Sequence, residues 1–315
     1  MHLLSLFATS TGVTGLPNIP AFVGIYLTFR IFSDFDLTVE GSLVTGAAVT
    51  AILVIHGWPW PLAMGVAVVA GGLAGLVTTV LHVVLRIPVL LSGLVMSLAL
   101  YSINLEIMTQ PTVAVTTQST LFSTVAHFSG ERADWVTIGI CGGVVVVVLF
   151  LLAVFLRTEI GLAMRAAGAN SLMARSYGVN NYLMLGIALV LGNALTELSG
   201  SLLAQSEGFA DVNMGLSVLI AGIGAILLGE LILRPTTSQV ARIMFTVSIG
   251  TLLYQFIQVV SLQIGISPNN LELVTALTLI FAIGARMSLS RTWQTIKSHS
   301  TDDLSLEASD RVVRK

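Results

Sequence analysis

The sequence predicts an all-α fold, a polytopic bundle of transmembrane helices. Of its 315 residues, 55% are hydrophobic and only 10% are charged, whereas a soluble domain usually carries about 25% charged residues. Apolar runs recur along the whole chain, and a helix needs about 20 mostly apolar residues to cross a bilayer. A water-soluble protein of this composition would have to cover its surface with core residues, so we expect about 8–10 spans.

About nine apolar segments are long enough, or nearly so, to cross a bilayer. They cover about residues 16–32, 43–55, 61–85, 87–108, 135–156, 182–205, 216–233, 240–262 and 271–285. The second segment is short and rich in glycine, which indicates a short or broken helix. We therefore expect one transmembrane domain over residues 1–290, followed by a polar tail over residues 291–315.

The positions of Lys and Arg orient these segments, because cytoplasmic loops of membrane proteins are enriched in both residues. With the polar tail in the cytoplasm, the nine segments place 13 of the 14 Lys and Arg residues on that side and only Arg132 outside. A wrong number of spans would scatter these charges over both sides. The sequence therefore predicts a multi-pass protein of the cell (inner) membrane, with a cytoplasmic C-terminus and an N-terminus outside.

The loop over about residues 158–181, on the predicted cytoplasmic side, carries the strongest signal. Glu159 to Ala167 are good helix formers, and we expect Gly168 to interrupt that helix. Asn170 is a favourable N-cap for a second, short helix, and Gly178 is a favourable residue just beyond its end. This second helix would insert an apolar knob into a groove of a partner protein, or it would lie on lipid headgroups. Its candidate contact residues are Arg165, Asn170, Leu172, Met173, Arg175, Tyr177 and Gly178.

Three runs of sequence resemble one family of transport proteins. The run GLAMRAAGANSLMARSYGVN (161–180) is similar to the cytoplasmic coupling loop of the permeases that serve branched-chain amino acid and ribose ABC importers. The run FRIFSDFDLTVEGSLVTGAAV (29–49) resembles the stretch after an early helix in these permeases, and VLRIPVLLSGLVMSLALYSINLEIM (84–108) resembles a poorly characterised subgroup. The resemblance covers about residues 20–290, but Pro17 and Pro20 depart from the smoother first helix of the family.

This resemblance implies the fold of a type II-like ABC importer permease, together with several partners. In the family, the coupling loop docks on an ATP-binding subunit, and a periplasmic or lipoprotein binding protein delivers the solute. A second permease copy would complete a homodimer. Some members of the subgroup are linked to aromatic amino acids, which implies an amino acid-like solute. Since the sequence has no G-x-x-x-x-G-K-[ST] motif, ATP and Mg²⁺ would be held by the partner ATPase, with no cofactor or metal in this chain.

Two short segments that precede glycine-rich spans resemble each other faintly. Asp36 or Thr38 can cap the helix that follows, close to Gly41. The run FADVNMG, which contains Asp211 and Gly215, echoes FDLTVEG at 35–41, and the predicted topology puts the two on opposite sides of the membrane. This pattern is expected of an inverted repeat with discontinuous helices that border a pathway. The alternative is plain capping at a cytoplasmic helix start.

Few strongly polar side chains fall inside the predicted spans. Such groups are costly in lipid and usually face a pathway or a partner. The candidates to line a translocation path are Asn104, Asn193, Glu197 and Gln255. The alternative is that these side chains form hydrogen bonds between helices or line a dimer seam.

We predict a permease subunit that passes a small solute across the membrane with energy from a separate ATPase, and no enzyme activity in this chain. The alternative is a secondary transporter driven by Na⁺ or H⁺. Such a transporter needs an intramembrane acid, and Glu197 is the only good candidate. A membrane enzyme would need clustered catalytic residues at one depth, and the sequence shows none. The sequence has no basic patch outside the helix ends, so nothing in it indicates nucleic-acid binding.

Overall fold

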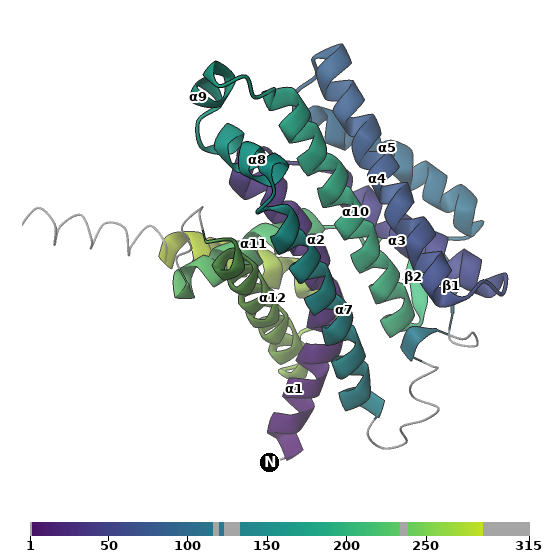
Figure 1. Ribbon diagram of the computed structural model, residues 1–315. Coiled ribbons are helices and arrows are strands. Elements are labelled where there is room, and N and C mark those ends of the chain that lie inside the picture. Colours follow the sequence, from purple (N-terminus) through teal and green to yellow (C-terminus); the bar gives the residue numbers. More distant parts are fainter. Residues whose placement is uncertain (1, 116–119, 123–132, 234–238, 286–315) are drawn as a thin grey trace, which may run out of the picture.

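The computed structural model describes residues 2–115, 120–122, 133–233 and 239–285 (Figure 1). The first half contains α1 (His2–Gly15), η1 (Leu16–Asn18), α2 (Ile19–Tyr26), the π-helical segment η2 (Leu27–Phe32), α3 (Thr38–Ile55), α4 (Trp60–Leu85), α5 (Val89–Met108) and β1 (Thr112–Ala114). The second half contains α7 (Ala133–Phe155), α8 (Glu159–Ala169), α9 (Ser171–Ser176), α10 (Asn181–Glu207), β2 (Phe209–Asp211), α11 (Val218–Ile232), α12 (Val240–Gln263), η4 (Pro268–Asn270) and a last helix, Leu271–Ala285.

The predicted all-α polytopic fold is confirmed. Within the described ranges, 7 helices are long and apolar enough to cross a membrane, and the shorter apolar helices α11 and Leu271–Ala285 fall on the remaining predicted segments. The first spanning rod begins earlier than expected, at Thr9. The second begins at Thr38 rather than near residue 43, because its polar first turn is buried between other helices. Hydropathy alone does not detect such a turn.

The two prolines near the start of the first span leave the rod unbroken. Pro17 lies in the first residues of η1, and Pro20 lies in the first turn of α2. A helix tolerates proline in its first turn, because the N–H that proline lacks would have no partner within the helix there. The hydroxyl of Ser199 on α10 donates to the carbonyl of Pro17. The departure from a smooth first helix is therefore accommodated locally.

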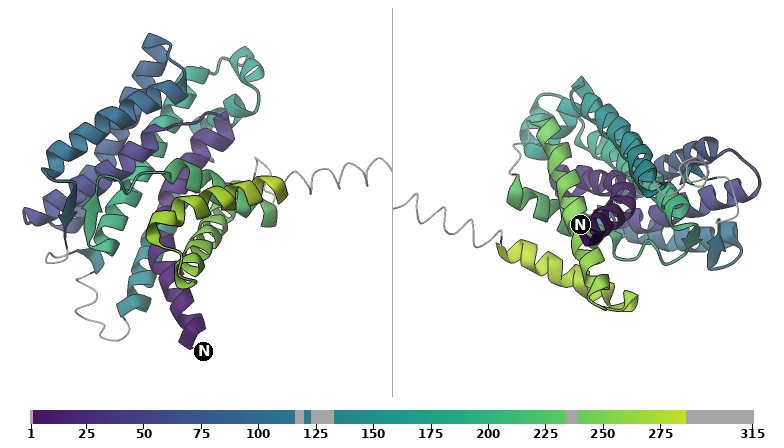
Figure 2. Two further views of the ribbon diagram at one scale, coloured as in Figure 1. Left: turned by 180° about the vertical axis from the view of Figure 1, so that it is seen from behind. Right: turned by 90° about the horizontal axis from the view of Figure 1, so that it is seen from below.

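α10 runs through the middle of the bundle, with α2, α3 and α4 packed around it (Figures 1 and 2). In the most apolar stretch of each helix, 72% of the residues of α3 and 67% of those of α10 are buried, against 22% for α4 and α5 and 17% for α7. A Cβ atom at Gly46 would lie 2.1 Å from the carbonyl oxygen of Glu197, and one at Gly71 would lie 2.6 Å from that of Asn193. Only glycine fits at these positions, so α3 and α4 approach the backbone of α10 directly.

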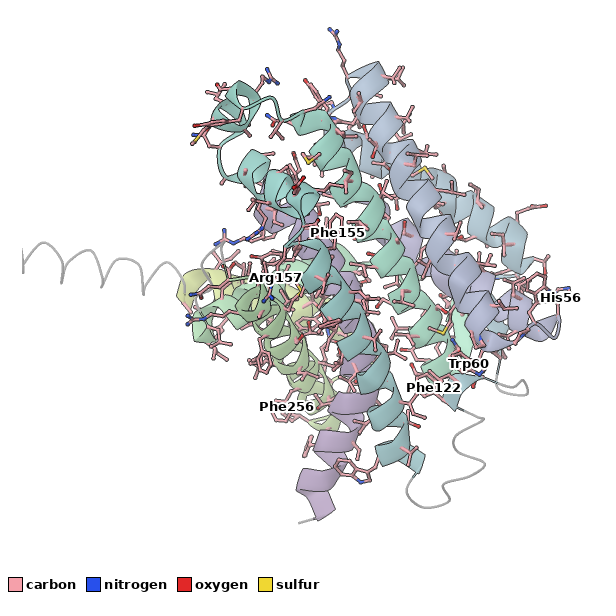
Figure 3. All side chains as sticks on the ribbon, viewed as in Figure 1. His56, Trp60, Phe122, Phe155, Arg157 and Phe256 are labelled. Carbon is pink, nitrogen blue, oxygen red and sulfur yellow. The ribbon has the colours of Figure 1, made fainter. Side chains whose placement is uncertain are left out.

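The outer helices expose large apolar side chains, which suits contact with lipid acyl chains (Figure 3). α11 and α12 pack on each other and against α2, and α12 also packs on α1, on the flank away from α5 (Figure 2). α8 and α9 lie at one end of the bundle, at the top of Figure 1, which we call the α9 end. The two strands lie toward the opposite end, where Trp60 and Phe122 each pack against a small cluster of buried side chains (Figure 3).

Candidate functional site

The break before α3 lies inside the bundle. Asp36 is fully buried. One of its carboxylate oxygens accepts from the backbone N–H of Thr38 at 2.9 Å, and the other accepts from Nδ2 of Asn193 at 2.7 Å. Thr38, which is also fully buried, shares a hydrogen bond of 2.9 Å with Thr78 on α4. The N-cap position of α3 is occupied by Leu37, and Asp36, one residue earlier, accepts from the first N–H of the helix. The burial of Asp36 argues against plain capping at a wet helix start and favours a discontinuous helix.

A line of buried polar contacts then follows the interface of α3 and α10. Ser42 donates to Oδ1 of Asn193 at 2.8 Å, and Thr50 donates to Ser201 at 2.7 Å. Between these two contacts, Gly46 faces the backbone of Glu197. The three contact positions are four residues apart on each helix and follow the same order along both. α3 and α10 therefore run parallel here, each with one face turned to the other. We call this line the polar seam; it comprises Asp36, Thr38, Ser42, Thr50, Thr78, Asn193, Glu197 and Ser201.

Glu197 is the exception within the polar seam. Its side chain is 0% exposed, and neither carboxylate oxygen has a hydrogen-bond partner among the described residues. An ionisable group inside a membrane domain is costly and usually has a function when it persists. Glu197 lies one helical turn from Asn193, as the sequence predicted, but it does not join the hydrogen bonds of that residue.

The four predicted path residues do not gather in one place. Asn104 is fully buried and donates to the carbonyl of Gly41 at 3.3 Å, which links α5 to the first turn of α3. Asn193 and Glu197 are buried between α10 and its neighbours. Gln255 is half-buried and lines a separate cavity near the start of α11. A shared role in a path stays a prediction for these residues.

The two segments that echo each other in sequence meet in space. A Cβ atom at Gly215 would lie 2.0 Å from the carbonyl oxygen of Glu40, so the turn before α11 touches the first turn of α3. Asp211 accepts from the backbone N–H of Asn213 at 2.8 Å and from the hydroxyl of Thr112, which ties this turn to β1. Both glycine-rich helices therefore begin beside each other within the bundle, whereas the predicted topology had put the two segments on opposite sides of the membrane. The inverted repeat itself stays a prediction.

The short helix predicted in the loop is present at the α9 end. Asn170 caps it by accepting from the backbone N–H of Met173 at 3.0 Å, and Gly178 follows it with a φ of 83°. Leu172, Met173 and Tyr177 are 77%, 57% and 78% exposed, while Ala174 on the other side is buried. The helix is thus held rigidly with its apolar side chains in the open. Arg175 is exposed on the same helix, and Arg165 is half-buried on α8.

The prediction that Gly168 interrupts the preceding helix is wrong. α8 continues through it to Ala169. A Cβ atom at Gly168 would lie 2.2 Å from the carbonyl oxygen of Ile31, so this glycine lets α8 rest on the backbone of η2. α8 therefore joins α9 to the end of the first spanning rod.

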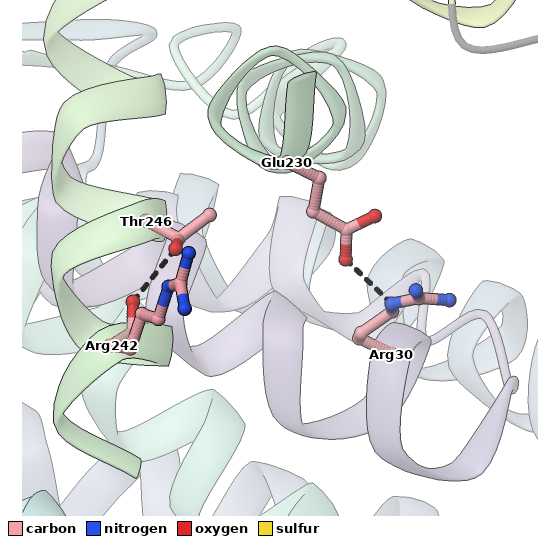
Figure 4. Close-up of polar contacts among 4 residues, drawn as sticks. All are labelled: Arg30, Glu230, Arg242 and Thr246. Carbon is pink, nitrogen blue, oxygen red and sulfur yellow. Dashed lines mark hydrogen bonds and ion pairs between the residues drawn. The ribbon is translucent and has the colours of Figure 1, made fainter. Parts of the chain in front are cut away.

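An ion pair connects the same rod to α11. Nε of Arg30 on η2 lies 2.6 Å from a carboxylate oxygen of Glu230 (Figure 4). Glu230 is 7% exposed and Arg30 is 43% exposed. Nothing in the sequence predicts this pair, because its members lie in different halves of the chain and belong to no shared motif. The contacts run without a gap from α9 through α8 and η2 to α11.

A groove of about 550 Å³ lies between α8–α9 and the ends of the spanning helices. Its walls include Asp34, His82 and Arg175, and the rings of His82 and Tyr182 lie 5.9 Å apart. Burial raises the pKa of the Asp34 carboxyl, and the nearby charge of His82 offsets part of that rise. The α9 end thus combines exposed apolar side chains with a polar groove, which suits a protein partner.

A bundle of apolar helices with a buried polar seam and an exposed capped helix at one end is that of a multi-pass membrane permease. Comparison with known proteins agrees. The family model for the permease component of the branched-chain amino acid transport system matches residues 14–283. The chain therefore belongs to this family, and it is the permease component of an amino acid transport system.

Two relatives support this assignment. The chain is 34% identical over 258 residues to a tyrosine transport system permease protein of Clostridioides difficile (strain R20291), covering 82% of this chain and 84% of the relative. It is also 34% identical over 273 residues to an uncharacterised protein of Rickettsia prowazekii (strain Madrid E), covering 85% of this chain and 93% of the relative. No solved structure is a significant match.

Proposed function

We propose that this chain is the permease of an ABC importer for an amino acid, and that α9 docks on a separate ATP-binding subunit. The observation that carries the proposal is the exposure of Leu172, Met173 and Tyr177 on a capped helix outside the bundle. Large apolar side chains on a rigid helix are costly in water and suit insertion into a groove. The partner subunit would bind ATP and Mg²⁺.

The proposed orientation puts the α9 end in the cytoplasm. Its support is the gathering of positive charge there, since cytoplasmic ends of membrane proteins are enriched in arginine. Arg86 follows α4, Arg157 lies between α7 and α8, and Arg30, Arg165 and Arg175 lie on η2, α8 and α9. The solute would then enter from a binding protein at the opposite end, and the C-terminus would be cytoplasmic.

The series of contacts that runs from α9 through α8 and η2 to α11 suggests how ATP hydrolysis acts on the bundle. A movement of α9 displaces α8, and α8 rests on the backbone of Ile31 through Gly168. Arg30, next to Ile31, holds Glu230 on α11. Closure of the ATPase would therefore shift α11 relative to α10, and a second permease copy would undergo the same shift across the dimer axis. The solute is proposed to be aromatic because one relative carries the name of a tyrosine transporter.

Charge reversal of the apolar surface tests the docking. We expect Leu172→Asp and Met173→Asp to abolish co-purification of the ATPase and ATP-dependent uptake, while membrane insertion stays normal. Ile264→Asp is the matched control, because Ile264 is also 77% exposed but lies beyond the far end of α12. Normal ATPase association in both α9 variants would mean that α9 lies on lipid headgroups, and would reject the proposal.

A second candidate function, an ion-coupled secondary transporter, is favoured by one observation, the unpartnered carboxylate of Glu197. A transporter driven by Na⁺ or H⁺ needs such an acid to bind the ion. Glu197→Gln separates the two functions, because it keeps the shape of the side chain and removes its charge. The importer should retain ATP-dependent uptake in this variant, whereas a secondary transporter should lose its response to the ion gradient.

A further inference from the structure

A cavity of about 230 Å³ lies where α10 ends and α11 begins, away from α8 and α9. Its walls come from η1 and α2, the last turns of α10, the turn before α11 and the first turn of that helix, the second half of α12 and the helix Leu271–Ala285. None of its lining residues belongs to the polar seam. Ligand sites for drug-sized molecules are usually larger, about 300–1,000 Å³, so this cavity suits one small metabolite.

One wall of the cavity is aromatic and fixed in place. The rings of Phe22 and Tyr254 lie 6.1 Å apart in an edge-to-face arrangement. The hydroxyl of Tyr254 lies 2.7 Å from Oγ1 of Thr275, which itself donates to the carbonyl of Leu271 at 3.0 Å. Tyr254 must therefore be the donor to Thr275. Gln258 donates to both hydroxyl oxygens, at 3.1 Å to that of Thr275.

Among Tyr254, Thr275 and Gln258, this network occupies the side-chain donors and leaves an acceptor. Because Nε2 of Gln258 is directed to Tyr254 and Thr275, its carbonyl oxygen is the part of the amide available to a ligand. Aromatic faces add attraction for a cation. Phe22 and Tyr254 are only 2% and 4% exposed, so the two rings give the cavity a narrow apolar border beside this acceptor. Such a border suits a molecule with an aromatic part and a hydrogen-bond donor.

The charged groups of the cavity are all acidic. Glu207 and Glu272 line it and are exposed, and no Lys, Arg or His lies among the lining residues that the structure describes. Neither carboxylate forms an ion pair with another described residue. Charge of one sign in a cleft with low-dielectric walls concentrates ligands of the opposite sign. The cavity therefore favours a cationic group and disfavours an anion that lacks one.

We propose that this cavity is the solute site of the permease, and that it binds an aromatic solute with a primary ammonium group. The ring lies against Phe22 and Tyr254, and the ammonium group lies toward Glu207 and Glu272. This inference rests on the proposed function, because it assigns a place to the solute of that importer. It adds the chemical class, which amino acids of the tyrosine type and the corresponding amines share.

The cavity is also placed to respond to the coupling contacts. Ser217, Val218 and Ala221 bring the first turns of α11 into its wall, while Glu230 at the other end of α11 is held by Arg30. A displacement of α11 would change the shape of the cavity. Binding and release of the solute would thus depend on the state of α9.

Direct binding tests the proposal without the ATPase or a binding protein. The full-length permease in lipid nanodiscs is titrated with radiolabelled tyrosine, in competition with tyramine, which lacks the carboxylate, and with 3-(4-hydroxyphenyl)propanoate, which lacks the ammonium group. We expect tyramine to compete and the propanoate not to. Glu207→Gln and Glu272→Gln should each weaken tyrosine binding about tenfold or more, as expected for loss of a charge-assisted contact. Glu106→Gln, an exposed acid outside the cavity, should have no effect.

Accessibility gives a second measurement that does not require tight binding. Ser217→Cys in a Cys141→Ser background introduces a thiol in the cavity wall, to be labelled with cationic and anionic methanethiosulfonate reagents. Each rate is divided by the rate of the same reagent with a free thiol in solution. On this scale the cationic reagent should react about tenfold faster than the anionic one, tyrosine should slow it, and the Glu207→Gln/Glu272→Gln pair should remove the preference. Equal normalised rates, or tyrosine binding unchanged in both Glu variants, would overturn the site. If ATP-dependent uptake persists in that case, the proposed function stands without this site. If instead the wild-type permease binds tyrosine but no ATPase associates with it, the site stands and the proposed function fails.

Discussion

Gly168 is the position where the proposed coupling is most sensitive to one added methyl group. In Gly168→Ala the new Cβ atom would lie 2.2 Å from the carbonyl oxygen of Ile31 and 2.7 Å from its Cγ2 atom. The oxygen belongs to the backbone of η2, so no side chain can rotate to make room. α8 must therefore move away by about 1 Å to reach ordinary van der Waals contact. Overpacking of this kind costs about 1–3 kcal/mol.

The expected result is a loss of coupling with the protein still folded. If the displaced contact between α8 and η2 lowers the coupling free energy by about 1.4 kcal/mol, ATP-dependent uptake falls about tenfold. The ATPase should still co-purify, because Leu172, Met173 and Tyr177 are unchanged. The assay is radiolabelled amino acid uptake in cells that express the whole importer, with ATPase association measured on the same membranes.

The control for this variant is Gly72→Ala on α4, where the nearest atom to a new Cβ is 3.9 Å away. Both variants add the same methyl group to a helix, so they share any effect of helix propensity. Uptake by Gly168→Ala equal to that of Gly72→Ala would refute the reasoning, because the contact with Ile31 would then carry no coupling. A loss of protein from the membrane in Gly168→Ala alone would show a structural role instead.

Three further outcomes are expected. Arg30→Gln should lower the free energy of unfolding in detergent by about 1–3 kcal/mol, less than the loss of a partner from a fully buried pair, because Arg30 is 43% exposed. The double variant Arg30→Gln/Glu230→Gln should recover part of this loss. Strictly additive effects of the two substitutions would mean that the ion pair contributes nothing. Asn193→Leu should cost about 3 kcal/mol, since it leaves one oxygen of the buried carboxylate of Asp36 without a donor while the other still accepts from the N–H of Thr38. Ser42→Ala should cost only about 1 kcal/mol; equal melting temperatures for the two would contradict the polar seam. Thr50→Val should be nearly neutral, because Ser201 only accepts in this bond and its own proton can still be donated to a backbone carbonyl of its helix; a large drop in melting temperature would contradict this.

Much of the fold follows from local properties of the sequence, because hydropathy and the positions of glycine, proline and asparagine act over a few residues. The nine apolar segments and the cap at Asn170 are of this kind. The four-residue spacing of Thr38, Ser42, Gly46 and Thr50 was also visible in the sequence and could have predicted the face that α3 turns to α10.

The contacts that join distant segments could not be predicted in this way. Gly168 was expected to interrupt a helix, since isolated glycine lowers helix propensity, but close packing on Ile31 outweighs that cost. Arg30 and Glu230 meet only because α11 folds back against α2. Likewise, Gln255 shares polarity with Asn193 but lies in the cavity with Tyr254, and polarity alone does not distinguish the two places.

The fold separates a stiff part from a part that can move. α2, α3 and α4 approach the backbone of α10 at glycine, and interiors packed this closely transmit displacement with little deformation. α11 is shorter than the spans of this core and begins inside the bundle, where its first turn meets the first turn of α3. The cavity with Phe22 and Tyr254 lies where these two parts meet, and the Arg30–Glu230 pair crosses the same boundary at the other end of α11. In the proposed mechanism, a force applied at α9 would therefore displace α11, which forms part of the cavity wall, while the polar seam keeps the core intact.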